Sequence, residues 1–452
     1  MTKSLKSLWA RFLFQDRGIL PTKRLLFVYL IISLVFMIGT IIGLSWAYVI
    51  TFNILALCIS LLDLLFSPSK QQLSFNRTLP KELERGISYS IEIEVSNSSP
   101  YFLSYQLLDG LPQYFERPFP LMGQIQKDSA VVITYDTTAT IRGEYEVQKL
   151  YFRYSSRFGL WEKQTTISLK ETVKVIPDLT ETKHYLENAQ SYLKYEGLNI
   201  RRQRSGVGDF SKIREFVVGD DPRKINWRQT AKLREVMTND YEPEHGKYIT
   251  ILIDCGRMMG AELKRGNRLE KALEAALTVT AAALKKGDYV SVLAFSKEIH
   301  VFVPLAKGMS HLKTILHAIY NLKVDASESN YGAVLRYLET VQKKRSLLLL
   351  FSDVRTFLHE ESALVYLLRL RQRHLFLMIG VEDQTLLKSV KEVPETVQQA
   401  MVKSIAQQQV IIKKREKSKW EKQGLQMIEA REEKLAVTAV SNYIEIMNQN
   451  LL

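Results

Sequence analysis

An uncharged run of 38 residues, 25–62, constrains this chain more than any other feature. A membrane-spanning helix needs about 20 apolar residues, so the run predicts two spans joined by a tight turn near GLSWA (43–47), with Trp46 and Tyr48 at the membrane interface. The run is too long for the helix of a soluble core, and a signal peptide would have an apolar region of only about 7–15 residues. We predict a transmembrane helical hairpin over residues 25–66.

The flanks of this hairpin predict its orientation. Residues 1–24 form a basic N-terminus with six Lys and Arg residues and one acid, whereas the turn between the spans carries no charge. Positive flanks stay in the cytoplasm, and two spans return the chain to the side it left. We therefore expect a multi-pass protein of the cell membrane with both termini cytoplasmic. Part of the net charge of +14 is then a topology signal. The only two cysteines, Cys58 and Cys255, suggest no disulfide framework.

Three further sections follow the hairpin. Residues 70–178 alternate apolar and polar side chains, are rich in Val, Ile, Thr and Tyr, and predict an antiparallel β-sandwich-like domain that is a spacer or interaction module. Residues 179–246 form a connecting section with helical stretches and a basic loop. Residues 247–452 alternate apolar strands with amphipathic helices, which predicts a mostly parallel, doubly wound α/β sheet covered on both faces.

The stretch VVGDDPRKINWRQTAKL, residues 217–233, concentrates charge around Trp227. We expect it to be mainly a structural latch between the β block and the α/β domain, with a side that faces a partner. In that hypothesis Trp227 is buried. Arg223 and Arg228 pair with Asp220 and Asp221, or these acids cap a helix that begins near Pro222. Two alternatives remain open, a pure docking surface and a cation site at the adjacent carboxylates. The residues of this structural or partner motif are Gly219, Asp220, Asp221, Arg223, Ile225, Trp227, Arg228 and Ala231.

Two acids, Asp254 and Asp353, follow predicted strands, and ligands bind beyond the carboxyl ends of the strands in open α/β sheets. This arrangement resembles the von Willebrand factor type A domain, whose metal-ion-dependent adhesion site begins with Asp-x-Ser-x-Ser. Here Gly256 and Met258 stand where the two serines belong, and neither supplies the hard oxygen ligand that Mg²⁺ prefers. A degenerate Mg²⁺ site at the two acids is one interpretation. The other is that they cap loops or hold Arg257.

The stretch 219–232 also resembles a known family. Its residues are close to the pattern G-D-D-x-R-x-I-D-W-x-x-[ST]-A-R, with Asn226 and Lys232 at two positions where the family has Asp and Arg. The segments RGEYEV, SRFGL, DCGRMM, KKGDYVSVLAFS, KKRSLLLLFSD and RHLFL add to the likeness over nearly the whole chain. The family is the bacterial domain of unknown function fifty-eight, membrane-anchored proteins with a degenerate von Willebrand A-like domain. This resemblance implies a MoxR-type AAA+ ATPase as partner, in the assembly or activation of other proteins.

Three classes of function come into question for such a chain. The sequence has no H-E-x-x-H, P-loop or G-x-S-x-G motif and no nucleophile with a base, so we expect no enzyme and no cofactor. The favoured hypothesis is a non-enzymatic interaction or scaffold protein in the lipid bilayer, with the ATPase and other membrane or envelope proteins as partners. The alternatives are a metal-dependent hydrolase using Asp254 and Asp353, and a protein that binds nucleic acid or anionic lipid through residues 201–232. We expect no specific nucleic acid, because a basic loop near an anionic leaflet has an ordinary explanation.

Overall fold

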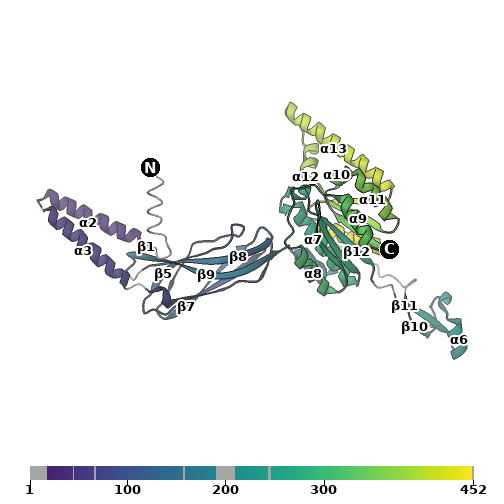
Figure 1. The fold of residues 1–452 in the computed structure, drawn as a ribbon, viewed down its shortest axis with the longest axis horizontal. Helices are drawn as coiled ribbons and strands as arrows, with labels where there is room; N and C mark the ends of the chain where they lie inside the picture. The colour runs from purple at the N-terminus through teal and green to yellow at the C-terminus, as the bar shows by residue number, and fades with distance from the viewer. Residues whose placement is uncertain are drawn as a thin grey trace. The chain divides into compact units, whose positions relative to one another are not determined.

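The computed structural model describes residues 18–43, 45–65, 68–155, 158–189, 209–242, 246–449 and 452. Most of the predicted basic N-terminus and the basic loop before residue 209 lie outside the described residues. The chain divides into two compact units, Met1–Ile176 and Pro177–Leu452, which are described separately below (Figure 1). The two apolar helices, the several β-sheets and the α/β mixture predicted from the sequence are confirmed.

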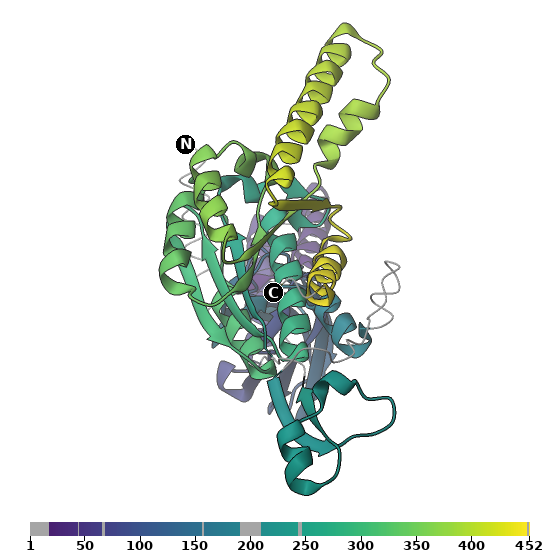
Figure 2. The ribbon, with the colours of Figure 1, turned by 90° about the vertical axis from the view of Figure 1, so that its right-hand side faces the viewer.

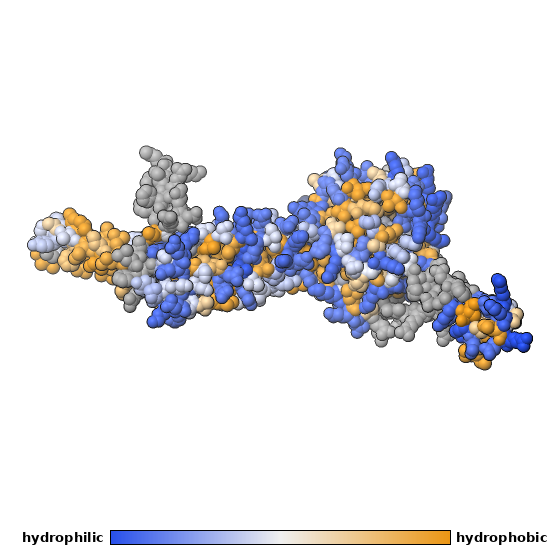
Figure 3. Space-filling view, turned by 60° about the horizontal axis from the view of Figure 1, so that its bottom comes forward, coloured by the Kyte–Doolittle hydropathy of each residue, from blue (hydrophilic) through white to orange (hydrophobic). Residues whose placement is uncertain are grey.

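The apolar run forms two helices, α2 (Lys23–Ile41) and α3 (Trp46–Leu65), with the turn where the sequence predicts it. The side chain of Thr22 caps α2 by accepting a hydrogen bond from the backbone N–H of Leu25 at 3.3 Å. Both helices are long and apolar enough to cross a membrane. Most of their large apolar side chains are exposed, as the orange surface of the two helices in Figure 3 shows.

The β block of the first unit consists of two sheets that share one core. In the three-stranded sheet, β4 (Ser88–Asn97) lies between β2 (Leu73–Thr78) and β7 (Ser129–Thr138). Ile91, Ile93 and Val95 of β4 are buried and the side chains between them are exposed, which is the period-two pattern of a half-buried strand. The second sheet has the order β1 (Ile19–Pro21), β9 (Trp161–Ile176), β8 (Gly143–Ser155), β5 (Leu103–Asp109), β6 (Leu121–Ile125), with β3 (Glu82–Glu84) also on β9.

Strand β1 precedes the apolar helices in the chain, yet it pairs with β9 after them. The sheet therefore contains residues from both sides of the helical hairpin. The sequence pattern did not predict this strand, because three residues are too few for an alternation to be visible.

Part of the connecting section forms a small element of its own in the second unit. Strands β10 (Asp209–Glu215) and β11 (Met237–Glu242) pair as an antiparallel ribbon, joined through the 3₁₀ turn η2 (Pro222–Lys224) and the helix α6 (Trp227–Leu233). We call residues 209–242 the ribbon segment. The sequence pattern predicted the helix but not the two strands. Before the ribbon segment, α4 (Thr180–Glu187) packs against α7 (Arg268–Lys286) of the α/β domain.

The α/β domain is built on one six-stranded sheet. Its order is β16 (Ile299–Ala306), β15 (Tyr289–Phe295), β12 (Tyr248–Asp254), β17 (Ser346–Phe351), β18 (Leu375–Val381), β19 (Gln426–Ala430). Only β16, an edge strand that the sequence pattern did not predict, pairs antiparallel. The central strands β12 and β17 are buried along almost their whole length, which explains why they read as continuous apolar runs.

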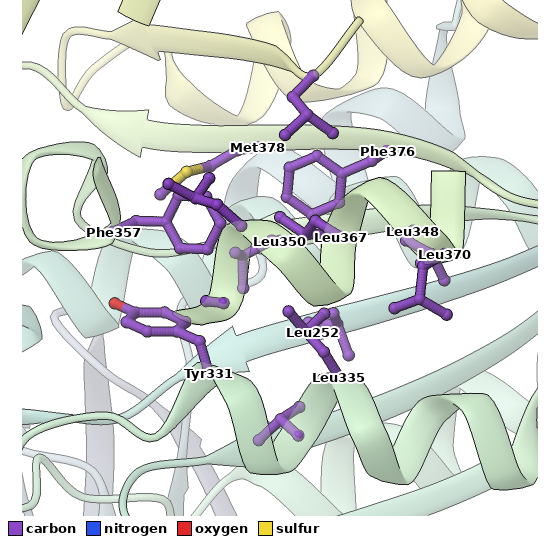
Figure 4. Close-up of a cluster of buried hydrophobic side chains, with 14 of the residues drawn as sticks. Leu252, Tyr331, Leu335, Leu348, Leu350, Phe357, Leu367, Leu370, Phe376 and Met378 are labelled. Atoms are coloured by element: carbon purple, nitrogen blue, oxygen red, sulfur yellow. The ribbon is translucent and has the colours of Figure 1, made fainter. Parts of the chain in front are cut away.

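Helices cover both faces of this sheet (Figure 2). One face carries α7 with its neighbours α8 (Met309–Ile319) and α14 (Leu435–Asn448). The other carries α9 (Tyr331–Val341), α10 (Val354–Leu358) and α11 (Glu361–Arg371), whose apolar side chains pack on Leu252, Leu350 and Met378 of the strands (Figure 4). The remaining helices are α12 (Gln384–Lys391) and the long α13 (Val397–Lys422).

Candidate functional site

Asp254 ends β12 and lies at the centre of a buried hydrogen-bond cluster. One carboxylate oxygen accepts from the backbone N–H of Gly256 at 2.8 Å and from the hydroxyl of Ser329. The other accepts from the Tyr331 hydroxyl at 2.8 Å and the Ser352 hydroxyl at 2.5 Å. Burial, followed by the charge of Asp254, raises the pKa of Tyr331 well above its usual range, so the phenol keeps the proton that it donates. Both oxygens of this carboxylate are therefore occupied by protein donors.

Gly256 stands where an adhesion-type site would have a serine, and the structure shows what fills that space. A Cβ atom on Gly256 would lie 2.0 Å from the Ser329 hydroxyl oxygen and 3.2 Å from the Ser329 backbone nitrogen. A serine at 256 could not coexist with the observed position of Ser329. The hydroxyl next to Asp254 is thus supplied by the loop that precedes α9, 75 residues along the chain.

Asp353, the second predicted acid, follows β17 and has a different set of partners. It caps α10, accepting from the backbone N–H of Thr356 at 3.0 Å and from its hydroxyl at 2.8 Å. Its other oxygen forms a 2.5 Å ion pair with Arg268, and both side chains are less than a tenth exposed. The interpretation that the acids cap loops is confirmed for Asp353. The suggestion that they hold Arg257 is wrong, because Arg257 pairs with Glu328 at 3.1 Å.

These partners bear directly on the possible Mg²⁺ site. In the part of the chain that the structure describes, no group of three or more His, Cys, Asp or Glu side chains is placed to hold a metal ion. A metal at Asp254 would have to displace hydroxyl donors that are already in place. Chemically, the cluster is suited to joining the strand ends to the loop before α9.

A Ser–His–Asp group also lies at this edge of the sheet. The Ser296 hydroxyl, just after β15, donates to Asp325 at 2.6 Å and lies 2.7 Å from Nε2 of His300. The hydrogen bond from Ser296 to Asp325 is the main cause of the lowering of the pKa of Asp325 to about 2. In a catalytic triad the serine donates to the histidine and the carboxylate holds the opposite ring nitrogen. Here the serine donates to the carboxylate, so the group is a loop contact and not an activated nucleophile.

In the ribbon segment, the two adjacent acids of the motif have separate roles. Asp220 forms two hydrogen bonds of 2.8 Å with the guanidinium of Arg214 and accepts from the backbone N–H of Val217 at 2.9 Å. The bonds from Arg214 are the main cause of the lowering of the pKa of Asp220. Asp221 caps η2 by accepting from the backbone N–H of Arg223 at 3.0 Å. The predicted cap at Pro222 is confirmed. The arginine that pairs with the Asp220 carboxylate is Arg214, and not Arg223 or Arg228 as predicted.

Other motif residues shape the backbone of the ribbon segment. Gly219 has a φ of 109°, a conformation that favours glycine. Asn226 caps α6 through the N–H of Gln229 at 3.1 Å and also donates to Asn239 of β11 at 2.8 Å. Asn226 thus serves as the helix cap although the family has Asp at this position. Ile225 forms a bridge with Thr238 of β11, while Arg223, Arg228 and Ala231 are exposed.

The prediction that Trp227 is buried is wrong for this chain, because its side chain is 70% exposed. A two-stranded ribbon with a seven-residue helix has too little interior to enclose an indole ring. Val217, Val218, Leu233 and Val236 of the same segment are also exposed. We call these four residues and Trp227 the Trp227 patch. Burial of Trp227 was the main support for the latch hypothesis, which is therefore weakened, while an exposed ring fits the docking alternative.

The ribbon segment and the parallel sheet after it are matched by a family model. Residues 212–423 match the family model described as "Protein of unknown function DUF58". The DUF58 match begins in β10 and ends one residue after α13. The matched family is the one that the motif resembles, and the matched part is shorter than the nearly complete resemblance expected from the sequence.

Other similarities are distant. "Uncharacterized protein YeaD" of Bacillus subtilis (strain 168) is 22% identical over 262 residues, which cover 55% of this chain and 61% of that protein. The chain thus spans about three fifths of the length of that relative. The conserved hypothetical protein BatB from Bacteroides thetaiotaomicron covers 45% of this chain and all of its own, at 14% identity and a TM-score of 0.31. PapD-like domain 7 of human CEP192 covers 24% of this chain and 89% of its own, at 12% identity and a TM-score of 0.18. Scores this low establish no shared fold.

Proposed function

We propose that this protein is a membrane-anchored, non-enzymatic interaction or scaffold protein. It works on the cytoplasmic face with a MoxR-type AAA+ ATPase in the assembly or activation of other membrane or envelope proteins. The observation that carries this proposal is the Trp227 patch, a set of exposed apolar side chains on a segment whose loop and helix ends are held by hydrogen bonds.

The patch has the composition of a protein-binding surface. Trp227 is 70% exposed and Val218 is 98% exposed, and the basic Arg223 and Arg228 lie within the same segment. Tryptophan and arginine are enriched among residues that dominate binding energy at interfaces. Figure 3 shows apolar and hydrophilic residues side by side on this segment. The fixed loop and helix ends support the proposal further, because a partner would meet a surface that is already ordered.

We further propose that the α/β domain is a von Willebrand A-like module whose adhesion site has become structural. The position of Asp254 and Asp353 at neighbouring strand ends supports this interpretation. The hydrogen bonds that saturate Asp254 support a module that recognises its partner without a metal. No observation favours the alternative of a metal-dependent hydrolase, since both carboxylates already have protein partners.

The test of the docking role is Trp227→Ala in the full chain, purified in mild detergent. Because the ring is exposed, we expect the free energy of unfolding to stay within about 0.5 kcal/mol of the parent. Capture of the ATPase should weaken by about tenfold or more, as expected for an interface hot spot. Urea unfolding and a pull-down scored for AAA+ ATPases are the two measurements.

The matched control is Val365→Ala, which truncates an apolar side chain of α11 that is 64% exposed and far from the motif in sequence. This variant should bind the ATPase as the parent does. Unchanged capture by the Trp227 variant would refute the docking role, and a large loss of stability would restore the latch.

The proposed topology has its own test. Reporters fused after Leu452 and after Phe66 should both give a cytoplasmic signal, because the positive flank keeps the N-terminus inside and α2 and α3 return the chain. The comparison is a reporter in the 42–45 turn, which should report the opposite side. An extracytoplasmic signal from either of the first two fusions would overturn the orientation.

A further inference from the structure

A large cleft lies in the first unit, on the outer face of the β1–β9–β8–β5–β6 sheet, next to the start of α2. Its volume is about 880 Å³. Ser104, Tyr105 and Gln106 of β5 are among the residues that line it, and Tyr105 is also buried with the core residues Leu103 and Leu107. The two polar side chains, Ser104 and Gln106, lie on the face of the strand opposite to this core.

The charges around the cleft favour an anion. Lys23, Arg24 and Arg153 line it, and Glu162 is the only acid among the described residues that line it. Arg153 is positioned by a 3.1 Å hydrogen bond to Gln164 and a 3.8 Å ion pair with Glu162. With one acid against three bases, the lining keeps an excess of positive charge. Arginine, with its planar set of N–H donors, is well suited to phosphate oxygens.

The loop at residues 158–161 joins the sheet to both apolar helices. Thr22, the cap of α2, donates its hydroxyl to the carbonyl of Gly159 at 2.7 Å. At the end of α3, the buried carboxylate of Asp63 accepts from the backbone N–H groups of Phe158 at 3.1 Å and Leu160 at 3.2 Å. These contacts hold the sheet, and the cleft on it, directly at the point where the helical hairpin begins and ends.

The cleft therefore lies at the level where a membrane-spanning hairpin meets the lipid head groups. Lys23 begins α2, and no charged residue follows it in that helix after Arg24. Leu26 and Phe27, the next large side chains, are 59% and 63% exposed, as residues in contact with acyl chains would be. Met122, an apolar residue that lines the cleft itself, is 68% exposed. Phosphate-binding bases beside exposed apolar residues match a lipid that has an anionic head and apolar tails.

We propose that this cleft binds the phosphate of an anionic phospholipid head group through Lys23, Arg24 and Arg153. The inference rests on the membrane anchoring in the proposed function. It adds a specific lipid site to that anchor and concerns residues outside the ribbon segment.

Native mass spectrometry of the full chain in a zwitterionic detergent tests this site. The probes are phosphatidylglycerol, phosphatidylcholine and inorganic phosphate. The parent should retain phosphatidylglycerol in preference to phosphatidylcholine. The double variant Arg24→Gln/Arg153→Gln should bind phosphatidylglycerol at least about tenfold more weakly than the parent, since two phosphate-facing bases are lost. The control is Lys149→Gln, which removes an exposed base of β8 that does not line the cleft and should leave binding unchanged.

Each other outcome overturns a defined part of the proposal. Equal binding of phosphatidylglycerol by the parent and the double variant would show that the cleft is not the site. Full displacement of the lipid by millimolar inorganic phosphate would make free phosphate the ligand and overturn the lipid assignment. Recovery of the chain in the soluble fraction of cells would instead refute the proposed anchoring. The native mass spectrometry in detergent would still show, independently of anchoring, whether the cleft binds the lipid.

Discussion

Replacement of Asp254 by alanine is expected to lower the free energy of unfolding of the α/β domain by about 3–5 kcal/mol, because each buried donor left without an acceptor costs roughly 1–3 kcal/mol. Three hydroxyl groups and one backbone N–H now share this carboxylate, and Asp254 is 1% exposed. Asp254→Asn, which keeps the size of the side chain and one acceptor oxygen, should lower the free energy of unfolding less than Asp254→Ala does. The measurement is urea unfolding of the full chain in detergent, followed by hydrogen exchange in peptides from β12 and β17.

Two comparisons make this result specific. Glu328→Ala removes a carboxylate that is 76% exposed and paired with Arg257, and it should change stability by less than about 0.5 kcal/mol. Millimolar Mg²⁺ should not raise the unfolding midpoint of the parent. A ligand stabilises the folded state by RT ln(1 + [L]/Kd), so a metal that has no binding site adds no stability. A clear Mg²⁺ effect that Asp254→Ala abolishes, without loss of metal-free stability, would show instead that the carboxylate is a metal ligand.

Arg77→Ala should destabilise the β-sandwich of the first unit by about 3–5 kcal/mol, the usual cost of removing one partner of a buried ion pair. Arg77 forms a 2.7 Å ion pair with Asp109, and both side chains are fully buried. Its guanidinium also donates to the carbonyls of Val147 at 2.9 Å and Leu169 at 2.7 Å. Alanine would leave a buried carboxylate without its cation and two carbonyls without donors. Hydrogen exchange in β4 and β8 during urea unfolding of the full chain would measure the loss.

The control for this second effect removes the whole polar group. Tyr135 donates to Asp109 at 2.7 Å, and burial, followed by the charge of Asp109, raises the pKa of Tyr135 well above its usual range. The triple variant Arg77→Met/Asp109→Leu/Tyr135→Phe should recover part of the stability, because apolar replacements leave no unpaired charge. If Arg77→Ala alone melts like the parent, the ion pair does not stabilise the sandwich, and the expectation is wrong.

The GDDPRKINW stretch shows where local reasoning succeeded and where it failed. The cap at Asp221 could be predicted, because a cap depends on residues within about three positions of each other. The partner of Asp220 could not, because Arg214 lies before the motif on a strand that the sequence did not show. The exposure of Trp227 was also out of reach, since burial depends on how much surrounding chain can cover the ring.

The sequence by itself determined those features whose physics is local. A 38-residue run without charge is long and apolar enough for two helices of membrane-spanning length, so the residue pattern alone was enough to predict them. Continuous apolar runs such as residues 346–351 likewise specified strands buried on both faces. Only the tertiary structure decided what Asp254 does, because Ser329 and Tyr331 reach it across 75 and 77 residues of chain. It also decided the cleft, which forms where α2, β5, β6 and β8 meet. Contacts between distant segments depend on packing, and no periodicity in the sequence records them.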